Sequence, residues 1–162
     1  MLAYFLLYTF FAKGQTDIPQ AQAMFIYNFT RLIDWPNKSG DFIIGVIGNN
    51  EVFDALSNYT QGKKVGLQNI VVRQFKEPTD ITPCHILFVG FSKTKSLTEI
   101  LKIVNDNHIL IITEKTGAIQ MGSAINFVIV GDKLKFEIKI DNATKYGLKV
   151  SSKLAEMAVK SY

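Results

Sequence analysis

Apolar residues recur with a helical period over residues 20–35, after a differently composed N-terminal segment. Asp17 and Pro19 form a helix-start signal just before this region. Pro36 ends the expected helix, because the residue that precedes a proline avoids the helical conformation. The pattern therefore predicts a first helix over residues 20–35.

Four later segments have the character of strands. Three continuous apolar runs, FIIGVIG from Phe42, HILFVG from His85 and HILIIT from His108, are typical of strands buried on both faces of a sheet. IVVRQF from Ile70 predicts a further strand. A GNN turn and a short helix follow the first run, and a helix over residues 92–105 connects the last two runs into a βαβ unit.

The pattern changes after Thr113. AINFVIVGDKLKFEIKI contains two apolar runs divided by Gly131 and Asp132, which predicts an antiparallel hairpin. In its second run apolar residues alternate with charged ones, so one face of that strand is expected to be in water. Polar residues then offer caps for a closing helical region that Gly147 interrupts: Asp141 or Asn142 before the interruption, and Ser151 or Ser152 after it.

These elements predict an α/β fold, with a mixed sheet of about six strands, helices on both faces and a C-terminal antiparallel hairpin. The chain has 162 residues, of which 48% are hydrophobic and 20% charged. That is enough for one buried core and too little for two typical domains. We therefore expect a single three-layer domain over residues 15–162.

The first residues, MLAYFLLYTFFAKGQ, contain an apolar run from Leu2 to Ala12. The run is too short to cross a bilayer as a helix, which takes about 20 residues, but it suits the apolar core of an export signal. Ala12 and Gly14 supply small residues for cleavage. We therefore expect residues 1–14 to be a signal peptide that is removed on export, with Gln15 as the mature start.

The expected first helix carries apolar or aromatic side chains on more than one face. On a helical wheel at about 100° per residue, one side is apolar and would cover the sheet: Ala21, Phe25, Ile26, Phe29, Leu32 and Ile33. Met24, Tyr27, Arg31 and Trp35, here called the outer stripe, fall on the opposite side and have the composition of an interaction hot spot. Two interpretations remain open. The outer stripe contacts a partner or a second copy of the chain, or Met24 and Trp35 pack within the monomer.

Candidate ligand-binding residues lie where strands end. Gly48, Asn49 and Asn50 follow the first predicted strand, and Ser92 follows the third. In α/β sheets, ligands bind beyond the carboxyl ends of the strands. The four residues are therefore candidates for a small-molecule site, although turn geometry also explains the Gly-Asn-Asn sequence.

Other motifs give no catalytic or metal site. SKTK at residues 92–95 and KTG at residues 115–117 fit two motifs of penicillin-recognising serine enzymes, but the intervening S-x-N element is missing. Cys84, His85 and His108 do not have metal-ligand spacing, and one cysteine cannot form an internal disulfide. The net charge of +4 comes from lysines without the aromatic residues that stack on bases. We expect no catalytic residue, metal, cofactor or nucleic acid.

Four stretches resemble the YfiR family of exported bacterial proteins. They are AMFIYNFTRLIDWP, FIIGVIGNNEVFDAL, CHILFVG and GSAINFVIVGDKLKFEIKIDNATKYGLKVSSKLAEMA. The stretches follow the family's order, and the resemblance extends over roughly residues 20–158. The last stretch is the most specific. The residues that fall at the family's spacing there are Gly122, Ile125, Asn126, Phe127, Phe136, Ala143, Gly147, Leu148, Ser151, Ser152 and Leu154.

The resemblance implies a regulator rather than an enzyme. The best-understood proteins of that family reside in the periplasm and repress a membrane-bound diguanylate cyclase by binding its periplasmic sensor portion, which lowers cyclic-di-GMP output and restrains biofilm formation. Other members accompany sensor kinases. The implied partner is thus an inner-membrane diguanylate cyclase or sensor kinase, with a homodimer as an open alternative. Those regulators carry disulfides, whereas Cys84 has no partner in this chain, so thiol-based control is in doubt here.

Three functional hypotheses result, of which the third, a small hydrolase, lacks the catalytic residues. The first is a periplasmic regulatory protein that controls a membrane signalling protein by direct contact. The alternative is a periplasmic small-molecule binding protein that uses the crevice near Asn49, Asn50 and Ser92. Co-purification with an inner-membrane sensor favours the first hypothesis, and thermal stabilisation by a ligand favours the second.

Overall fold

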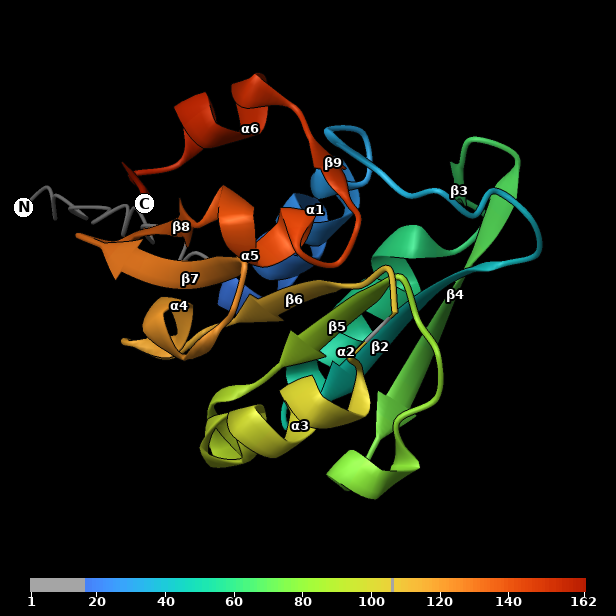
Figure 1. Ribbon diagram of the computed structural model, residues 1–162, viewed down its shortest axis with the longest axis horizontal. Helices are drawn as coiled ribbons and strands as arrows, with labels where there is room; N and C mark the ends of the chain where they lie inside the picture. Colours follow the sequence, from blue (N-terminus) through green and yellow to red (C-terminus); the bar gives the residue numbers. More distant parts are fainter. Residues whose placement is uncertain (1–16, 106) are drawn as a thin grey trace, which may run out of the picture.

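A mixed β-sheet forms the centre of the protein in the computed structural model, which describes residues 17–105 and 107–162 (Figure 1). The predicted signal peptide, residues 1–14, lies outside the described residues. From one edge of the sheet to the other, the strands are β10 (Lys160–Ser161), β8 (Lys133–Ile138), β7 (Ile125–Val130), β6 (Leu110–Thr113), β5 (Ile86–Val89), β2 (Phe42–Ile47), β4 (Gln68–Phe75) and β3 (Lys64–Val65).

The middle of the sheet is parallel and its ends are antiparallel or short. β4, β2, β5, β6 and β7 are parallel neighbours in that order. β8 returns antiparallel to β7, with Phe127 opposite Phe136, which confirms the predicted hairpin. The expected strands are β2, β4, β5, β6, β7 and β8. β3 and β10 add two residues each at the edges and are too short to produce a periodic pattern in the sequence.

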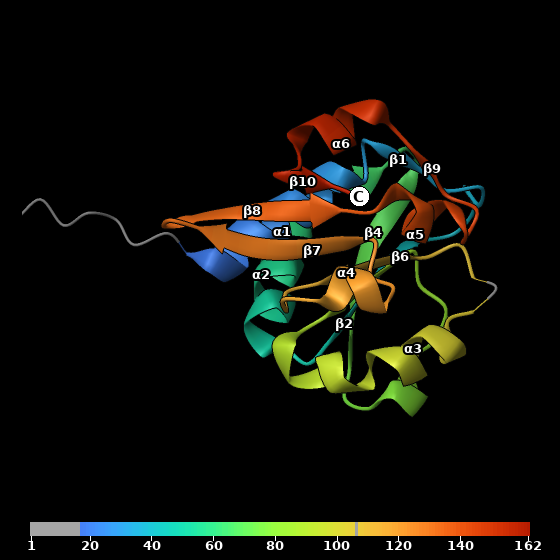
Figure 2. The ribbon, with the colours of Figure 1, turned by 60° about the vertical axis from the view of Figure 1, so that its left-hand side comes forward.

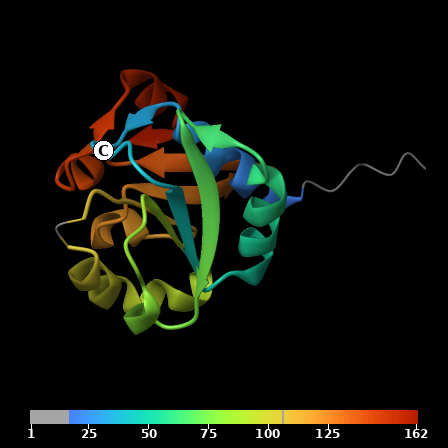
Figure 3. The ribbon, with the colours of Figure 1, turned by 90° about the vertical axis from the view of Figure 1, so that its right-hand side faces the viewer.

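Helices cover both faces of the sheet, which confirms the three-layer α/β prediction (Figures 2 and 3). α1 (Ile18–Phe29) and α2 (Asn50–Thr60) pack on one face. The 3₁₀ helix η2 (Phe91–Ser96) and α3 (Leu97–Ile103) pack on the other, where Leu97 and Ile100 are buried. The remaining short elements are η1 (Pro78–Asp80), α4 (Ala118–Met121), α5 (Ile140–Thr144) and α6 (Ser152–Met157).

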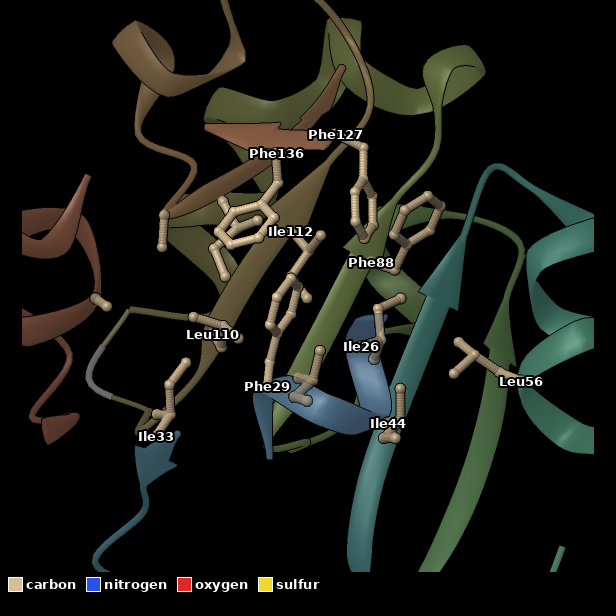
Figure 4. Close-up of a cluster of buried hydrophobic side chains, with 14 of the residues drawn as sticks. Ile26, Phe29, Ile33, Ile44, Leu56, Phe88, Leu110, Ile112, Phe127 and Phe136 are labelled. Carbon is tan, nitrogen blue, oxygen red and sulfur yellow. The ribbon is translucent and has the colours of Figure 1, made fainter. Parts of the chain in front are cut away.

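The larger core lies between α1 and the sheet (Figure 4). Ile26 and Phe29 are fully buried, as the helical wheel predicts. The Phe29 ring meets the Phe136 ring edge-on, with 5.0 Å between the ring centroids, and stacks on the Phe127 ring, with 6.2 Å between the centroids. Aromatic pairs in these arrangements stabilise a core beyond the area that they bury.

The first helix is shorter than predicted. α1 begins at its Asp17 cap, where Oδ1 accepts a hydrogen bond from the Gln20 backbone, but it ends at Phe29 rather than at residue 35. The chain then turns into β1 (Ile33–Asp34), which pairs antiparallel with β9 (Lys149–Val150). Pairing with a segment more than a hundred residues away thus overrides a helical period that extends to residue 35.

The C-terminal caps were predicted in part. Ser151 caps α6, since its side chain accepts a hydrogen bond from the Lys153 backbone. The predicted cap at Asp141 or Asn142 is wrong, because the cap residue of α5 is Lys139. Asn142 lies inside α5, and its Nδ2 donates to the carbonyl oxygens of Ile119 and Ser123. Its amide therefore ties α5 to the end of α4 instead.

Candidate partner-binding and ligand-binding surfaces

Two tyrosines and two cations form a cluster on the outer surface of α1 and α2. The rings of Tyr27 and Tyr59 meet edge-on at 5.8 Å. The Lys63 Nζ atom lies 3.4 Å from the centroid of the Tyr59 ring, and the Arg31 guanidinium lies 5.0 Å from that of Tyr27. Each cation is attracted by the negative face of a ring, and each also donates a hydrogen bond within the cluster, Arg31 to the Tyr27 hydroxyl and Lys63 to the Tyr59 carbonyl oxygen. We call these four residues the aromatic–cation cluster.

The outer stripe is only partly on the surface. Met24 and Arg31 are exposed and Tyr27 is half-buried, so these three lie on the outside as predicted. The outward position predicted for Trp35 is wrong, because its side chain is only 2% exposed. Of the two interpretations left open, packing within the monomer therefore holds for Trp35 and not for the exposed Met24. The helical wheel fails at Trp35 because α1 has already ended at Phe29.

Trp35 instead anchors β1 to the sheet. Its indole Nε1 donates a hydrogen bond of 2.9 Å to the carbonyl oxygen of His85. The Trp35 ring meets the Phe42 ring edge-on, with 4.9 Å between the ring centroids. The Phe42 ring in turn stacks on the His85 ring, with 4.4 Å between the centroids. This arrangement combines a large buried apolar surface with a satisfied indole N–H, which is how buried tryptophan usually packs.

A groove of about 520 Å³ lies between the α1–β1 turn, β9 and the β3–β4 hairpin. Trp35 and Phe42 contribute to its lining, and Arg31, Lys38 and Lys149 bring three positive charges to it. Asp34 is the acidic residue there, and its hydrogen bond with Lys38 lowers the pKa of the Asp34 carboxyl. The residues that line the groove therefore carry a net positive charge.

The predicted ligand crevice is partly assembled. Gly48, Asn50 and Ser92 line a cavity of about 450 Å³ together with residues of β4 and the segment that follows it. Lys93 and Glu77 form an ion pair of 2.7 Å in the same lining. Asn49 does not line the cavity. Its Oδ1 accepts a hydrogen bond from the Val52 backbone and caps α2, so local helix geometry explains that residue.

Glu114 occupies the centre of the region beyond the strand ends. Its Oε1 accepts hydrogen bonds from Nδ2 of Asn49 at 3.0 Å and from the Phe91 backbone at 2.9 Å. Its Oε2 accepts one of 2.8 Å from Nε2 of Gln22, which is buried in α1. Three donors from different segments thus bind the carboxylate of Glu114, which is a side chain of this protein and not a bound ligand. Sequence reasoning missed Glu114, although it is the first residue after the apolar run of β6.

The potentially reactive side chains are buried or used in packing. Burial raises the pKa of the Cys84 thiol to about 12, so the thiolate is scarce at neutral pH. Burial lowers the pKa of His85, whose Nδ1 accepts a hydrogen bond from the Ile43 backbone at 3.0 Å. Within residues 17–105 and 107–162, no three His, Cys, Asp or Glu side chains are grouped so that they could hold a metal ion.

The family model described as YfiR/HmsC-like matches residues 19–159 of the chain. In the part of the chain that the structure describes, no helix is both long enough and apolar enough to cross a membrane.

Proposed function

The chain belongs to the YfiR/HmsC-like family, and from this premise we propose that it is an exported regulatory protein, which controls a membrane signalling protein by direct contact. The observation that carries the proposal is the extent of the match, since residues 19–159 include the fold from α1 to α6 almost completely. The family is regulatory rather than catalytic. The proposed location is the periplasm, and the proposed partner is an inner-membrane diguanylate cyclase or sensor kinase.

The proposed contact surface is Met24 together with the aromatic–cation cluster. Tyrosine and arginine are enriched among residues that dominate binding energy at protein interfaces. Among the described residues, the ion pairs are Lys38–Asp34 and Lys93–Glu77, so Arg31 and Lys63 keep their charges available for carboxylates of a partner. Trp35 is left out of this surface, because its role is to pack β1 onto the sheet.

A double variant, Tyr27→Asp with Arg31→Glu, tests the contact surface. Both side chains point away from the core, so the circular dichroism spectrum and the melting temperature should stay close to those of the parent. Capture of the membrane partner from native envelopes, measured by crosslinking and pull-down, should be lost. Retention of capture and of signalling control by a folded double variant would show that the partner binds elsewhere.

The matched control places the same charges on another surface. Phe91 is exposed, and Lys115 Nζ lies 5.1 Å from the centroid of its ring, so this pair resembles Tyr27 and Arg31 in composition. Phe91→Asp with Lys115→Glu should leave partner capture at the parental level. Equal loss in both double variants would point to net charge rather than to the proposed surface.

Export is tested by the intact mass of the protein from the periplasmic fraction. We propose that residues 1–14 are removed, so the mass should correspond to a chain that begins near Gln15. A full-length chain confined to the cytoplasm would contradict both the export proposal and a periplasmic partner.

The cavity beside Gly48, Asn50 and Ser92 supports small-molecule binding as a second candidate function. Its volume of about 450 Å³ lies within the range of known ligand pockets. A ligand that binds the folded state alone raises the melting temperature. A screen of small polar compounds should then find stabilisation that the cavity-filling change Ser92→Leu removes. Stabilisation that survives Ser92→Leu would place the ligand elsewhere.

A further inference from the structure

One edge of the sheet is open along most of a strand. β3 pairs with β4 through Lys64 opposite Asn69 and Val65 opposite Gln68, and the Ile70 N–H donates one further hydrogen bond to the carbonyl oxygen of Lys63. Among residues 17–105 and 107–162, no strand pairs with the outer side of β4 from Val71 to Phe75. Figure 3 looks toward this edge. β4 is the strand nearest the viewer, and β3 lies beside only its upper end.

The backbone groups on this edge can be assigned from the pairing. Ile70 donates its N–H to the carbonyl oxygen of Lys63, so the backbone polar groups of Ile70 point away from β2. Because successive residues of a strand point their backbone groups to alternate sides, those of Val72 and Gln74 also point outward. Beyond Ile70, no strand among the described residues takes up these groups, so the edge offers donors and acceptors of the kind that bind an added strand.

The side chains along the edge combine apolar contact with positive charge. Val71 and Val72 are half-buried, whereas Arg73 and Gln74 are exposed. Residues 64–76 contain Lys64, Arg73 and Lys76 and no acidic residue. The Arg73 guanidinium donates a hydrogen bond to the neutral Thr82 hydroxyl, so its charge is not offset by that contact. The next acidic residue, Glu77, is paired with Lys93.

We propose that the outer edge of β4, from Val71 to Phe75, binds an extended segment of a partner protein that carries acidic residues, which adds to the sheet as a further strand. The backbone groups of Val72 and Gln74 form hydrogen bonds with the backbone of the added strand. Val71 and Val72 contact its apolar side chains, and Arg73 and Lys76 form ion pairs with its carboxylates. A second copy of the same edge fits poorly, because it would bring the same positive charges together.

This site is separate from the surface assigned under the proposed function. The β4 edge is the border of the sheet, whereas the aromatic–cation cluster lies on the outside of α1 and α2. A test with short peptides needs no membrane partner. Failure of the peptide test therefore leaves the proposed function standing, and failure of partner capture leaves the edge proposal standing.

The probe is an acetylated and amidated heptapeptide in which valine alternates with glutamate, and its binding to the purified protein is measured by fluorescence anisotropy at low salt. Two control peptides are used. One has lysine in place of glutamate, and the other has the acidic sequence with a methyl group on every backbone nitrogen, so that neither edge of the peptide can donate ladder hydrogen bonds. Both should bind on the order of tenfold more weakly, since one reverses the charge and the other removes ladder hydrogen bonds. Equal binding of the acidic peptide and its methylated form would overturn the proposal.

Gln74→Pro examines the same edge from the protein side. The change removes an N–H that points away from β2, so an edge strand should tolerate it, while affinity for the acidic peptide should fall on the order of tenfold. Gln74→Ala is the matched control, because it removes the same side chain and keeps the N–H. Unchanged affinity in a folded Gln74→Pro variant would overturn the proposal. If that variant does not fold, the methylated peptide on the parent protein still decides the question.

Charge and self-association complete the test. Arg73→Glu should weaken binding of the acidic peptide on the order of tenfold, whereas Lys153→Glu, the same charge change on the exposed side of α6, should not.

Sedimentation measures whether the β4 edges of two copies of the protein pair with each other. A dimer of the parent that Gln74→Pro dissociates would identify a second copy as the occupant and would overturn the proposal.

Discussion

Glu114 holds together three segments that are far apart in the sequence. Its carboxylate accepts hydrogen bonds from Gln22 in α1, from Asn49 at the start of α2 and from the Phe91 backbone. Hydrogen bonds to an ionised acceptor are stronger than those between neutral groups. One side chain therefore fixes the arrangement of both helices around the ends of β2, β5 and β6.

Removal of this carboxylate should destabilise the protein. Glu114→Ala leaves the buried amide of Gln22 without its acceptor, which should lower the free energy of unfolding by about 1–3 kcal/mol. Glu114→Gln should cost less, because its remaining oxygen can still accept from Asn49 and Phe91. Urea unfolding measures both changes. An alanine variant as stable as the parent would mean that these hydrogen bonds contribute nothing net.

His85 should make stability depend on pH. Burial lowers its pKa in the folded state below the ordinary value of 6.5, so the unfolded chain binds the proton more readily. The stabilisation is therefore complete above that ordinary value and is lost as the pH falls through it. The melting temperature should decrease between about pH 7 and pH 5. His85→Gln, which keeps an acceptor in the side chain, should have a flatter profile, and an identical slope would assign the effect to other groups.

The segment after α1 shows how a distant strand redirects local structure. The helical period continues to residue 35, but β1 leaves the helix path to pair with β9, and Trp35 then enters the core beside Phe42. Leu32 strengthens the junction, because its carbonyl oxygen accepts a hydrogen bond of 2.8 Å from the Ser151 backbone. The N- and C-terminal parts of the domain are joined at this point.

The single tryptophan of the chain provides the measurement for this region. Trp35 is buried, so its fluorescence emission should lie at shorter wavelength in the native protein than after unfolding in urea. Trp35→Phe keeps an aromatic ring and loses one hydrogen bond, at a cost of about 1 kcal/mol. Trp35→Ala should cost about 3–5 kcal/mol, because it leaves a cavity. Native emission equal to that of the unfolded chain would place Trp35 on the surface after all.

The molecule as a whole should be stable without a disulfide or a metal. Cys84 is the single cysteine of the chain and is buried, and the described residues contain no cluster of metal ligands. Reductant and chelator should therefore leave the melting temperature unchanged in a thermal unfolding experiment. A fall of several degrees in the melting temperature with chelator alone would reveal a metal site that is not apparent among the described residues.

The sequence by itself determined the main strands, the C-terminal hairpin and the class of the fold. Strands such as β2 are buried at every position, so a continuous apolar run is enough to predict them. The hairpin is visible because β7 and β8 are joined by a turn at Gly131, whose φ of +66° suits glycine. The family resemblance is also a property of the sequence, and the match over residues 19–159 confirms it.

The tertiary structure alone decided where Trp35 and Glu114 lie and which strand edges are open. The sequence left open whether Trp35 faces outward or packs within the monomer. The chain leaves the path of α1 where β1 pairs with β9, and Trp35 is buried there; no local pattern around residue 35 contains that information. Glu114 gains its three donors from segments 23 to 92 residues away. The length of β4 that stays open is set by where its pairing with the two-residue strand β3 ends, and that strand is too short to show a pattern in the sequence. Local periodicity reports burial within an element, whereas contacts between distant elements are set only when the whole core packs.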